Sequence, residues 1–101
     1  MEPVLRAISD PRRREIMGLV RFEERTVGDI ASHFEVSRPA ISQHLTLLRH
    51  AGLVSERRDG NRRLYRARPE ALAEVRAYIE DFWADHRGRL KAAAESEGRQ
   101  R

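Results

Sequence analysis

A change in hydrophobic period at Gly52 is the sequence feature that most restricts how this chain can fold. Before Gly52, apolar residues recur at helical steps of four and three: Ile41, Leu45 and Leu48. We therefore predict a helix over 38–50 that ends at the glycine. After Gly52, two short extended runs over 53–58 and 62–66 flank Asp59-Gly60-Asn61, a tripeptide typical of hairpin turns. The predicted order is a helix, a glycine stop and a β-hairpin.

Three further helices are predicted before residue 38. A short opening helix covers 3–8, and a second helix follows the capping residue Asp10 and runs to about Phe22. The third begins after Thr26, whose spacing to Asp29 has the outline of a capping box. The arginines that open the second helix are expected to form a solvated face: Arg12, Arg13 and Arg14.

Pro69 starts the last predicted helix, in which apolar residues recur at steps of three and four. These residues are Leu72, Val75, Ile79, Phe82 and Trp83. They provide more apolar surface than a chain of 101 residues needs to cover its other helices. The length fits one domain over 1–94, and the polar residues 95–101 are expected to fray. The predicted fold class is mainly α, with about five helices and a small two-stranded hairpin.

The positive charge of the chain is concentrated in one segment. The whole sequence carries 20 basic and 16 acidic residues, a formal net charge of +4. Residues 37–68 contain eight arginines and two acids, whereas 1–36 and 69–101 each contain one more acid than base. A mixed charged surface does not predict this separation. Concentrated positive charge on a small domain is typical of a protein that binds a polyanion, although basic surfaces also dock acidic proteins or lipid headgroups.

Several classes of protein are disfavoured by what the sequence lacks. It contains no cysteine, which excludes disulfides, thiol nucleophiles, cysteine-based zinc sites and iron–sulfur clusters. No apolar run approaches the ~18–20 residues that cross a bilayer, and the N-terminus lacks the pattern of a signal peptide. We therefore expect a cytoplasmic location and no membrane insertion. No catalytic motif has a supporting context, so we predict no enzymatic activity and no cofactor.

Two short helices joined by a tight turn and followed by a basic hairpin have the order of a winged helix-turn-helix. Over about residues 4–83, the sequence resembles the ArsR-type family of small bacterial transcriptional repressors. Five stretches carry the resemblance: 8–16 (ISDPRRREI), 26–31 (TVGDIA), 36–45 (VSRPAISQHL), 47–54 (LLRHAGLV) and 57–65 (RRDGNRRLY). Each stretch is moderately specific, and their order and spacing together indicate the family.

The resemblance implies that helix 38–50 is a recognition helix, which enters the major groove of DNA. Its predicted DNA contacts are Ser37, Arg38, Pro39, Ser42, Gln43, Thr46 and Arg49. Arg38 suits guanine or a phosphate, Gln43 suits adenine, and Thr46 offers a hydroxyl and a methyl group for thymine. His44 falls between the inward and outward faces, and we expect it to pack rather than to read bases.

The hairpin would be the wing, which places charge beside the DNA backbone or in the minor groove. Its candidate contacts are Arg57, Arg58, Arg62 and Arg63. Because side chains alternate between the two faces of a strand, we do not expect all four to face DNA. The preferred contacts are Arg62, which lies nearest the turn, and one of Arg57 and Arg58.

The resemblance also implies a homodimer built from the first and last helices. The predicted dimer contacts are Val4, Leu5, Leu72, Val75, Ile79, Phe82 and Trp83. Isologous pairing would present two recognition helices to a pseudo-palindromic operator, with half-sites about 10–10.5 bp apart.

Many members of this family sense metals through cysteines, or through carboxylate and histidine ligands on the last helix. The first route is closed by the absence of cysteine. On the last helix, Asp81, Asp85 and His86 have no second histidine three or four residues further on. We therefore predict no metal site, and a small-molecule or protein effector stays open.

The sequence thus predicts a homodimeric, sequence-specific repressor that binds double-stranded DNA and occludes a promoter, in association with the bacterial nucleoid. Two alternatives stay open. One is an architectural DNA binder that tolerates many sequences. The other is a regulator whose winged-helix surface binds an acidic protein or a membrane protein.

Overall fold

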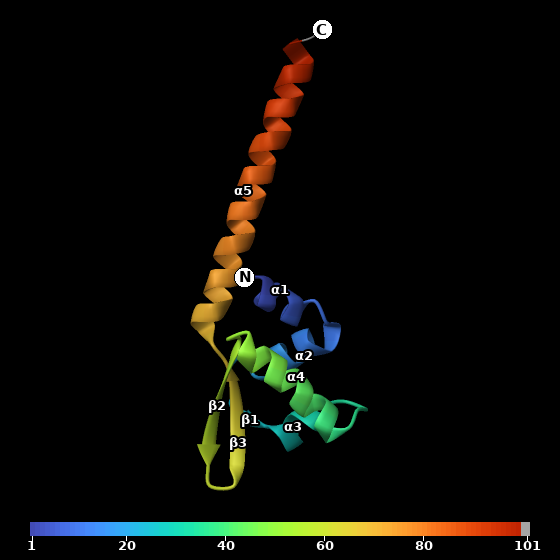
Figure 1. Cartoon of the computed structure of the whole chain (residues 1–101), viewed down its shortest axis with the longest axis vertical. Coiled ribbons are helices and arrows are strands. Elements are labelled where there is room, and N and C mark those ends of the chain that lie inside the picture. Colours follow the sequence, from blue (N-terminus) through green and yellow to red (C-terminus); the bar gives the residue numbers. More distant parts are fainter. Residues whose placement is uncertain (100–101) are drawn as a thin grey trace.

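The chain folds into a small helical body with a β-sheet at one end and one long helix that leaves it (Figure 1). The structure, a computed structural model, describes the backbone of residues 1–99 and the side chains of 1–94. Within these residues there are five helices and three strands: α1 (Glu2–Ile8), α2 (Pro11–Leu19), β1 (Arg25–Thr26), α3 (Val27–Ala31), α4 (Arg38–His50), β2 (Val54–Asp59), β3 (Arg62–Ala67) and α5 (Pro69–Arg99). The five helices and the hairpin confirm the predicted fold class.

The predicted hairpin is present, and a third strand extends it. Strands β2 and β3 pair antiparallel, from Val54 opposite Ala67 to Asp59 opposite Arg62, and Gly60 turns the chain with a φ of +63°. Strand β1 adds to the free edge of β3 and gives the order β1-β3-β2. Because β1 has only two residues, no alternating pattern could reveal it in the sequence.

The hydrophobic core lies between the helices and the sheet. The inward stripe of α4 is fully buried, with Ile41, Leu45 and Leu48 all 0% exposed. These side chains belong to one cluster with residues of α2, α3 and β2, including Ile16, Ile30 and Val54. Burial of this stripe fixes which face of α4 is left outward, and the outward face carries the predicted DNA contacts.

Helix α2 ends earlier than predicted, at Leu19 rather than near Phe22. Val20 leaves helical geometry, and its carbonyl accepts a hydrogen bond from the backbone N–H of Ala67 in β3 at 2.9 Å. This bond ties the end of α2 to the sheet and directs the following residues outward, so that Phe22 is 74% exposed.

The arginines at the start of α2 form the predicted solvated face only in part, because Arg14 is exposed but Arg12 and Arg13 are half-buried. Arg13 donates to the carbonyls of Ala7 and Arg6 at 2.6 and 3.2 Å, and its side chain is 14% exposed. Arg14 donates to the carbonyl of Ile8 at 2.8 Å, and Arg12 lies over the ring of Phe34. Arg13 and Arg14 therefore satisfy the last carbonyls of α1 and hold that helix against α2.

Only the first turns of α5 pack into the body. Ala71 and Val75 are buried in the core cluster, so Val75, predicted as a dimer contact, contributes to the core of the monomer. Beyond them the helix leaves the body (Figure 1). The helical backbone passes residue 94, the predicted end of the domain, and reaches Arg99. Of the tail that is predicted to fray, residues 95–99 are helical in their backbone, and residues 100–101 lie outside the described part.

Candidate nucleic-acid interface

The outward face of α4 carries short polar groups and one arginine near its start. Ser37 caps the helix, because its Oγ accepts a hydrogen bond from the N–H of Ala40 at 3.3 Å. The remaining predicted contacts on this helix are exposed or half-buried: Arg38, Pro39, Ser42, Gln43, Thr46 and Arg49. This face can therefore offer hydrogen bonds and a guanidinium to a partner.

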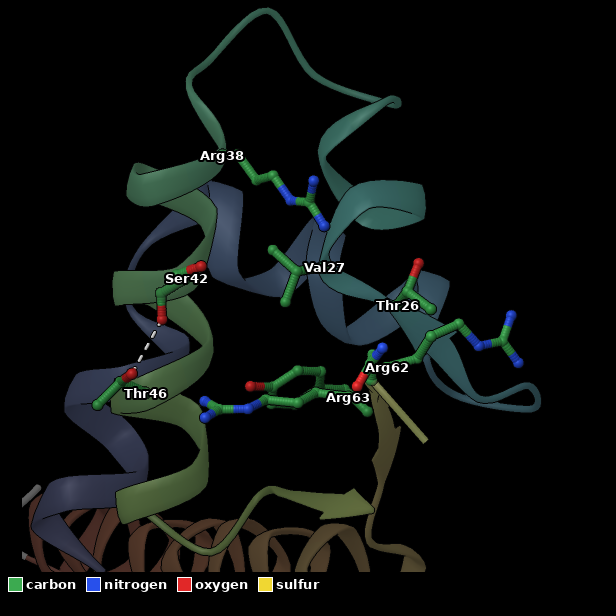
Figure 2. A pocket seen from close by; sticks show the side chains of 9 residues that line it. Thr26, Val27, Arg38, Ser42, Thr46, Arg62 and Arg63 are labelled. Atoms are coloured by element: carbon green, nitrogen blue, oxygen red, sulfur yellow. Dashed lines mark hydrogen bonds between the residues drawn. The ribbon is translucent and has the colours of Figure 1, made fainter. Parts of the chain in front are cut away.

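A groove of about 420 Å³ runs between α4 and the wing. From α4 and the wing it is lined by Arg38, Ser42, Thr46, Asn61, Arg62, Arg63 and Tyr65, and from the start of α3 by Thr26 and Val27. Figure 2 shows Arg63 reaching toward α4, whereas the guanidinium of Arg62 extends away from that helix. The groove therefore brings the predicted recognition helix and the predicted wing onto one surface.

Arg38 reaches into this groove over the start of α3, as Figure 2 shows. A Cβ atom at Gly28 would stand 3.3 Å from Nη2 of Arg38, so the missing side chain makes room for the guanidinium. Among the residues that the structure describes, Arg38 forms no ion pair, and its charge is available to a ligand.

The wing arginines differ in how strongly acids hold them. Arg57 makes a two-pronged contact with Glu24, with Nη2 2.7 Å from Oε2. These hydrogen bonds hold the pKa of the Glu24 carboxyl below its usual value and raise the pKa of Arg57. Arg62 lies 3.5 Å from Asp59 across the turn, whereas Arg58 has no ion pair within the described part of the chain. Arg58 is thus the freer of the two arginines between which the sequence left the choice open.

A second acid, Glu56 of β2, lies on the side of the wing that faces α4. Its Oε2 accepts from Nη1 of Arg49 at 3.1 Å and from the hydroxyl of Tyr65 at 3.3 Å, and its Oε1 lies 3.7 Å from Nε of Arg63. Burial, and then the Glu56 carboxylate, raise the pKa of Tyr65. One carboxylate therefore contacts side chains from both the helix and the hairpin.

His44 packs rather than pointing outward, as predicted. Its ring lies 3.4 Å from Nη1 of Arg13 and 3.8 Å from Oδ2 of Asp10, and the side chain is 22% exposed. Asp10 caps α2 by accepting from the N–H of Arg12, and this bond is the main cause of the lowered pKa of its carboxyl. His44 thus joins the recognition helix to the start of α2.

Sequence reasoning missed four residues that line the groove: Thr26, Val27, Asn61 and Tyr65. Thr26 was identified only as a helix cap, a role in which its Oγ1 accepts from the N–H of Asp29 at 3.1 Å. The acid of that capping box does not reciprocate, because Asp29 accepts from Arg25 instead. Strand β1 is what brings Thr26 beside Leu64 of β3, and β1 gave no signal in the sequence.

The residues considered for a metal are not grouped as a site. Within the described part of the chain, no set of three or more histidine, cysteine or acidic residues is placed to hold a metal ion. His86 instead stacks on Phe82, with ring centroids 4.0 Å apart. The described helices also include none that is long and apolar enough to cross a membrane.

Comparisons with known proteins agree with this geometry. The model of the bacterial regulatory proteins of the arsR family matches residues 10–56, which include α2, α3, α4 and the start of the wing. The transcriptional repressor SdpR of Bacillus subtilis is 48% identical over 60 residues, which are 59% of this chain and 67% of that protein. This chain belongs to the ArsR family. The resemblance predicted from the sequence is therefore confirmed.

Solved structures of ArsR-type proteins share the fold. A possible transcriptional regulator for arsenical resistance is 46% identical, with a TM-score of 0.74 over 87% of this chain and 92% of that one. The homodimeric winged helix-turn-helix DNA-binding domain of Mb0332 from Mycobacterium bovis is 32% identical, with a TM-score of 0.68 over 84% and 79%. The family and these relatives are DNA-binding transcriptional regulators rather than enzymes, as predicted for this chain.

Proposed function

We propose that this ArsR-family chain is a homodimeric repressor that binds a pseudo-palindromic operator and blocks transcription by occluding the promoter. The observation that carries the proposal is the groove in which an outward polar helix face and a basic wing share one surface. Two relatives support the proposal: SdpR is named as a transcriptional repressor, and the Mb0332 domain is described as a homodimeric DNA-binding domain. A regulator of this kind would act in the bacterial cytoplasm, at the nucleoid.

The residues of α4 would read base edges in the major groove. Gln43 suits the paired donor and acceptor of adenine, and Thr46 offers a methyl group to thymine. The Thr46 hydroxyl donates to the carbonyl of Ser42 at 2.9 Å, which turns its methyl group to a fixed side. Arg38 would contact guanine or a phosphate at the start of the helix. Ser37, Pro39 and Ser42 would complete the contact surface.

The wing would supply contacts to the phosphate backbone. Arg58 and Arg62 are the proposed contacts. Among the described residues, Arg58 has no ion pair and Arg62 pairs with the exposed Asp59, whereas the acid beside Arg63, Glu56, is only 16% exposed. Arg57 is held by Glu24, while Arg49 and Arg63 are held by Glu56. Phosphate contacts position the protein, whereas contacts from α4 would specify the sequence.

The dimer would form through the outward part of α5. Ile79, Phe82 and Trp83 are 43%, 50% and 54% exposed and follow one another at helical spacing. Large apolar side chains exposed side by side mark a protein contact rather than a solvent face. Val4, Leu5 and Leu72 are half-buried in the monomer and would lie at the edge of this contact.

Selection of bound duplexes from random DNA tests the proposal. We expect enrichment of a two-fold symmetric sequence with half-sites about one helical turn apart. Binding to this duplex should weaken steeply between ~50 and 200 mM salt. Enrichment of no sequence, with salt-dependent binding to all duplexes, would instead indicate an architectural DNA binder. No measurable DNA binding at physiological salt would favour a protein partner.

A further inference from the structure

Glu56 faces the recognition helix from the wing. In an antiparallel pair, directly opposite residues share a face, so Glu56 lies on the same face as its partner Tyr65 and as the next pair, Arg58 and Arg63. This is the face that buries Val54 against the body. The Glu56 side chain is only 16% exposed. A carboxylate in such a place is costly unless it is paired, and its contacts with Arg49, Arg63 and Tyr65 provide the pairing.

The two arginines that Glu56 holds belong to the proposed DNA surface. Arg49 continues the helix stripe of Arg38, Ser42 and Thr46 at steps of four, four and three. Arg63 lines the groove itself and reaches toward α4 (Figure 2). Released from Glu56, each would be a guanidinium with a free fork on a surface that meets DNA, and guanidinium groups bind phosphates of any sequence.

We propose that Glu56 is a specificity-determining residue, which keeps Arg49 and Arg63 from binding phosphates indiscriminately and holds the wing in register with α4. A phosphate that takes either arginine leaves a largely buried carboxylate with fewer partners, and this cost reduces the gain from the new contact. On the selected duplex, base-edge contacts position α4, so that Arg49 and Arg63 can stay with Glu56, whereas on other sequences binding depends on phosphate contacts and the cost applies in full. Base-edge contacts from Gln43 and Thr46 do not depend on these two arginines and keep their full contribution. Glu56 thereby raises the ratio of specific to non-specific affinity. The inference rests on the proposed function, because it assumes that the groove binds DNA.

The substitution Glu56→Gln tests this role. Glutamine keeps a side-chain oxygen for the Tyr65 hydroxyl but removes the charge that restrains the arginines. Affinity is measured by fluorescence anisotropy at several salt concentrations, on a random-sequence duplex and on the duplex selected from random DNA. We expect several-fold tighter binding to the random duplex, with a salt slope steeper by about one to two units per protomer, since each new phosphate contact adds about 0.9. The ratio of the two affinities should fall.

Glu80→Gln is the matched control. It causes the same change in charge and releases Arg76 from a 3.0 Å ion pair, but it lies on α5, outside the groove. We expect little change in the salt slope from this variant. If both variants bound the random duplex more tightly by the same factor, net charge alone would explain the effect and the proposal would be wrong. The proposal would also be wrong if Glu56→Gln left the affinity for the random duplex and its salt slope unchanged. It would likewise be wrong if the variant unfolded at the wild-type temperature and yet bound both duplexes equally more weakly.

Arg49→Gln provides a second test if Glu56→Gln does not fold. Because Glu56 already restrains Arg49, its loss should change random-duplex affinity by less than about twofold, whereas an unrestrained phosphate contact would lower the salt slope by about 0.9 per protomer. A slope reduced by that amount would contradict the proposal. If the wild-type protein bound no DNA, the proposed function itself would fail, which differs from every outcome expected of the variants.

Discussion

Two of the exposed surfaces of this chain differ in their chemistry. The groove between α4 and the wing exposes hydroxyls, an amide and arginines, whereas the outward part of α5 exposes Ile79, Phe82 and Trp83. The first surface suits a hydrated polyanion, because forked cations and short polar groups bind phosphates and base edges. The second suits a protein face that is itself apolar. The two proposed partners, DNA and a second copy of the chain, would therefore bind at opposite ends of one small domain.

The largest effect is expected from breaking the α5 surface. The double substitution Phe82→Ser and Trp83→Ser should abolish dimerisation at micromolar concentration, because central aromatic contacts commonly contribute about 2 kcal/mol or more each. Operator affinity should fall by at least about 30-fold, since 1.4 kcal/mol corresponds to a factor of ten. Sedimentation equilibrium and anisotropy measure the two effects.

Asp81→Ser, on the same helix but on the side opposite the apolar stripe, is the control for this variant and should remain dimeric. The far-ultraviolet circular dichroism of the double variant should keep its helical signal. A double variant that stayed dimeric would remove the distinction between the two surfaces, because α5 would then not be the protein contact.

A smaller effect is expected from the base-reading face of α4. Gln43→Ala should cost about 1–3 kcal/mol on the selected duplex and relax the preference at one base pair in each half-site. Binding to random duplexes should change little. Repetition of the selection with the variant provides the measurement. An unchanged consensus, with equal weakening on all sequences, would show that Gln43 contacts the backbone instead.

The wing offers a sharper comparison between two neighbouring arginines. Arg58→Ala should reduce the salt slope by about 0.9 per protomer, as expected for the loss of one phosphate contact. Arg57→Ala should reduce it much less, because Arg57 is held by Glu24 on the other face of the strand. A salt titration of both variants on a random duplex distinguishes them. A larger reduction from Arg57→Ala would reverse the roles.

The smallest effect concerns stability against acid. The pKa values of Asp10 and Glu24 are lowered in the folded chain, so protons bind the unfolded chain more tightly. Stability from these groups is complete above their ordinary values of 3.8 and 4.5, and it is lost as the pH falls through the lower folded values. Asp10→Asn keeps a capping oxygen but does not titrate, so its melting temperature should fall less steeply with acid. An identical acid dependence would exclude Asp10 as a contributor.

The sequence was sufficient to predict the helices, but it did not predict the contacts between residues that lie far apart along the chain. Local periodicity was sufficient for α4, because Ile41, Leu45 and Leu48 mark its buried face within one helix. It could not divide the arginines of the wing, since Arg57 is held by Glu24, which lies 33 residues away along the chain. The short strand β1 was invisible for a related reason: two residues have no period, and only pairing with β3 defines the strand.

The apolar residues of α5 show the same limit. Periodicity predicted a single stripe that includes Val75 and Ile79, and the resemblance to the ArsR-type family assigned both to a dimer. In the structure Val75 is 8% exposed and Ile79 is 43% exposed, because the helix leaves the body between them. The place where a helix leaves its own core depends on the length of the neighbouring elements, and no spacing within the helix reveals it.

The salt dependence of wild-type binding tests most directly the central claim, that this chain binds one DNA sequence preferentially and through phosphate contacts of its arginines. Anisotropy on the selected duplex and on a random duplex, from ~50 to 200 mM salt, should give a log–log slope of about −5 if three arginines of each protomer contact phosphates. The selected duplex should bind more tightly than the random duplex at every salt concentration. A slope near zero, or equal affinities for both duplexes, would contradict the account.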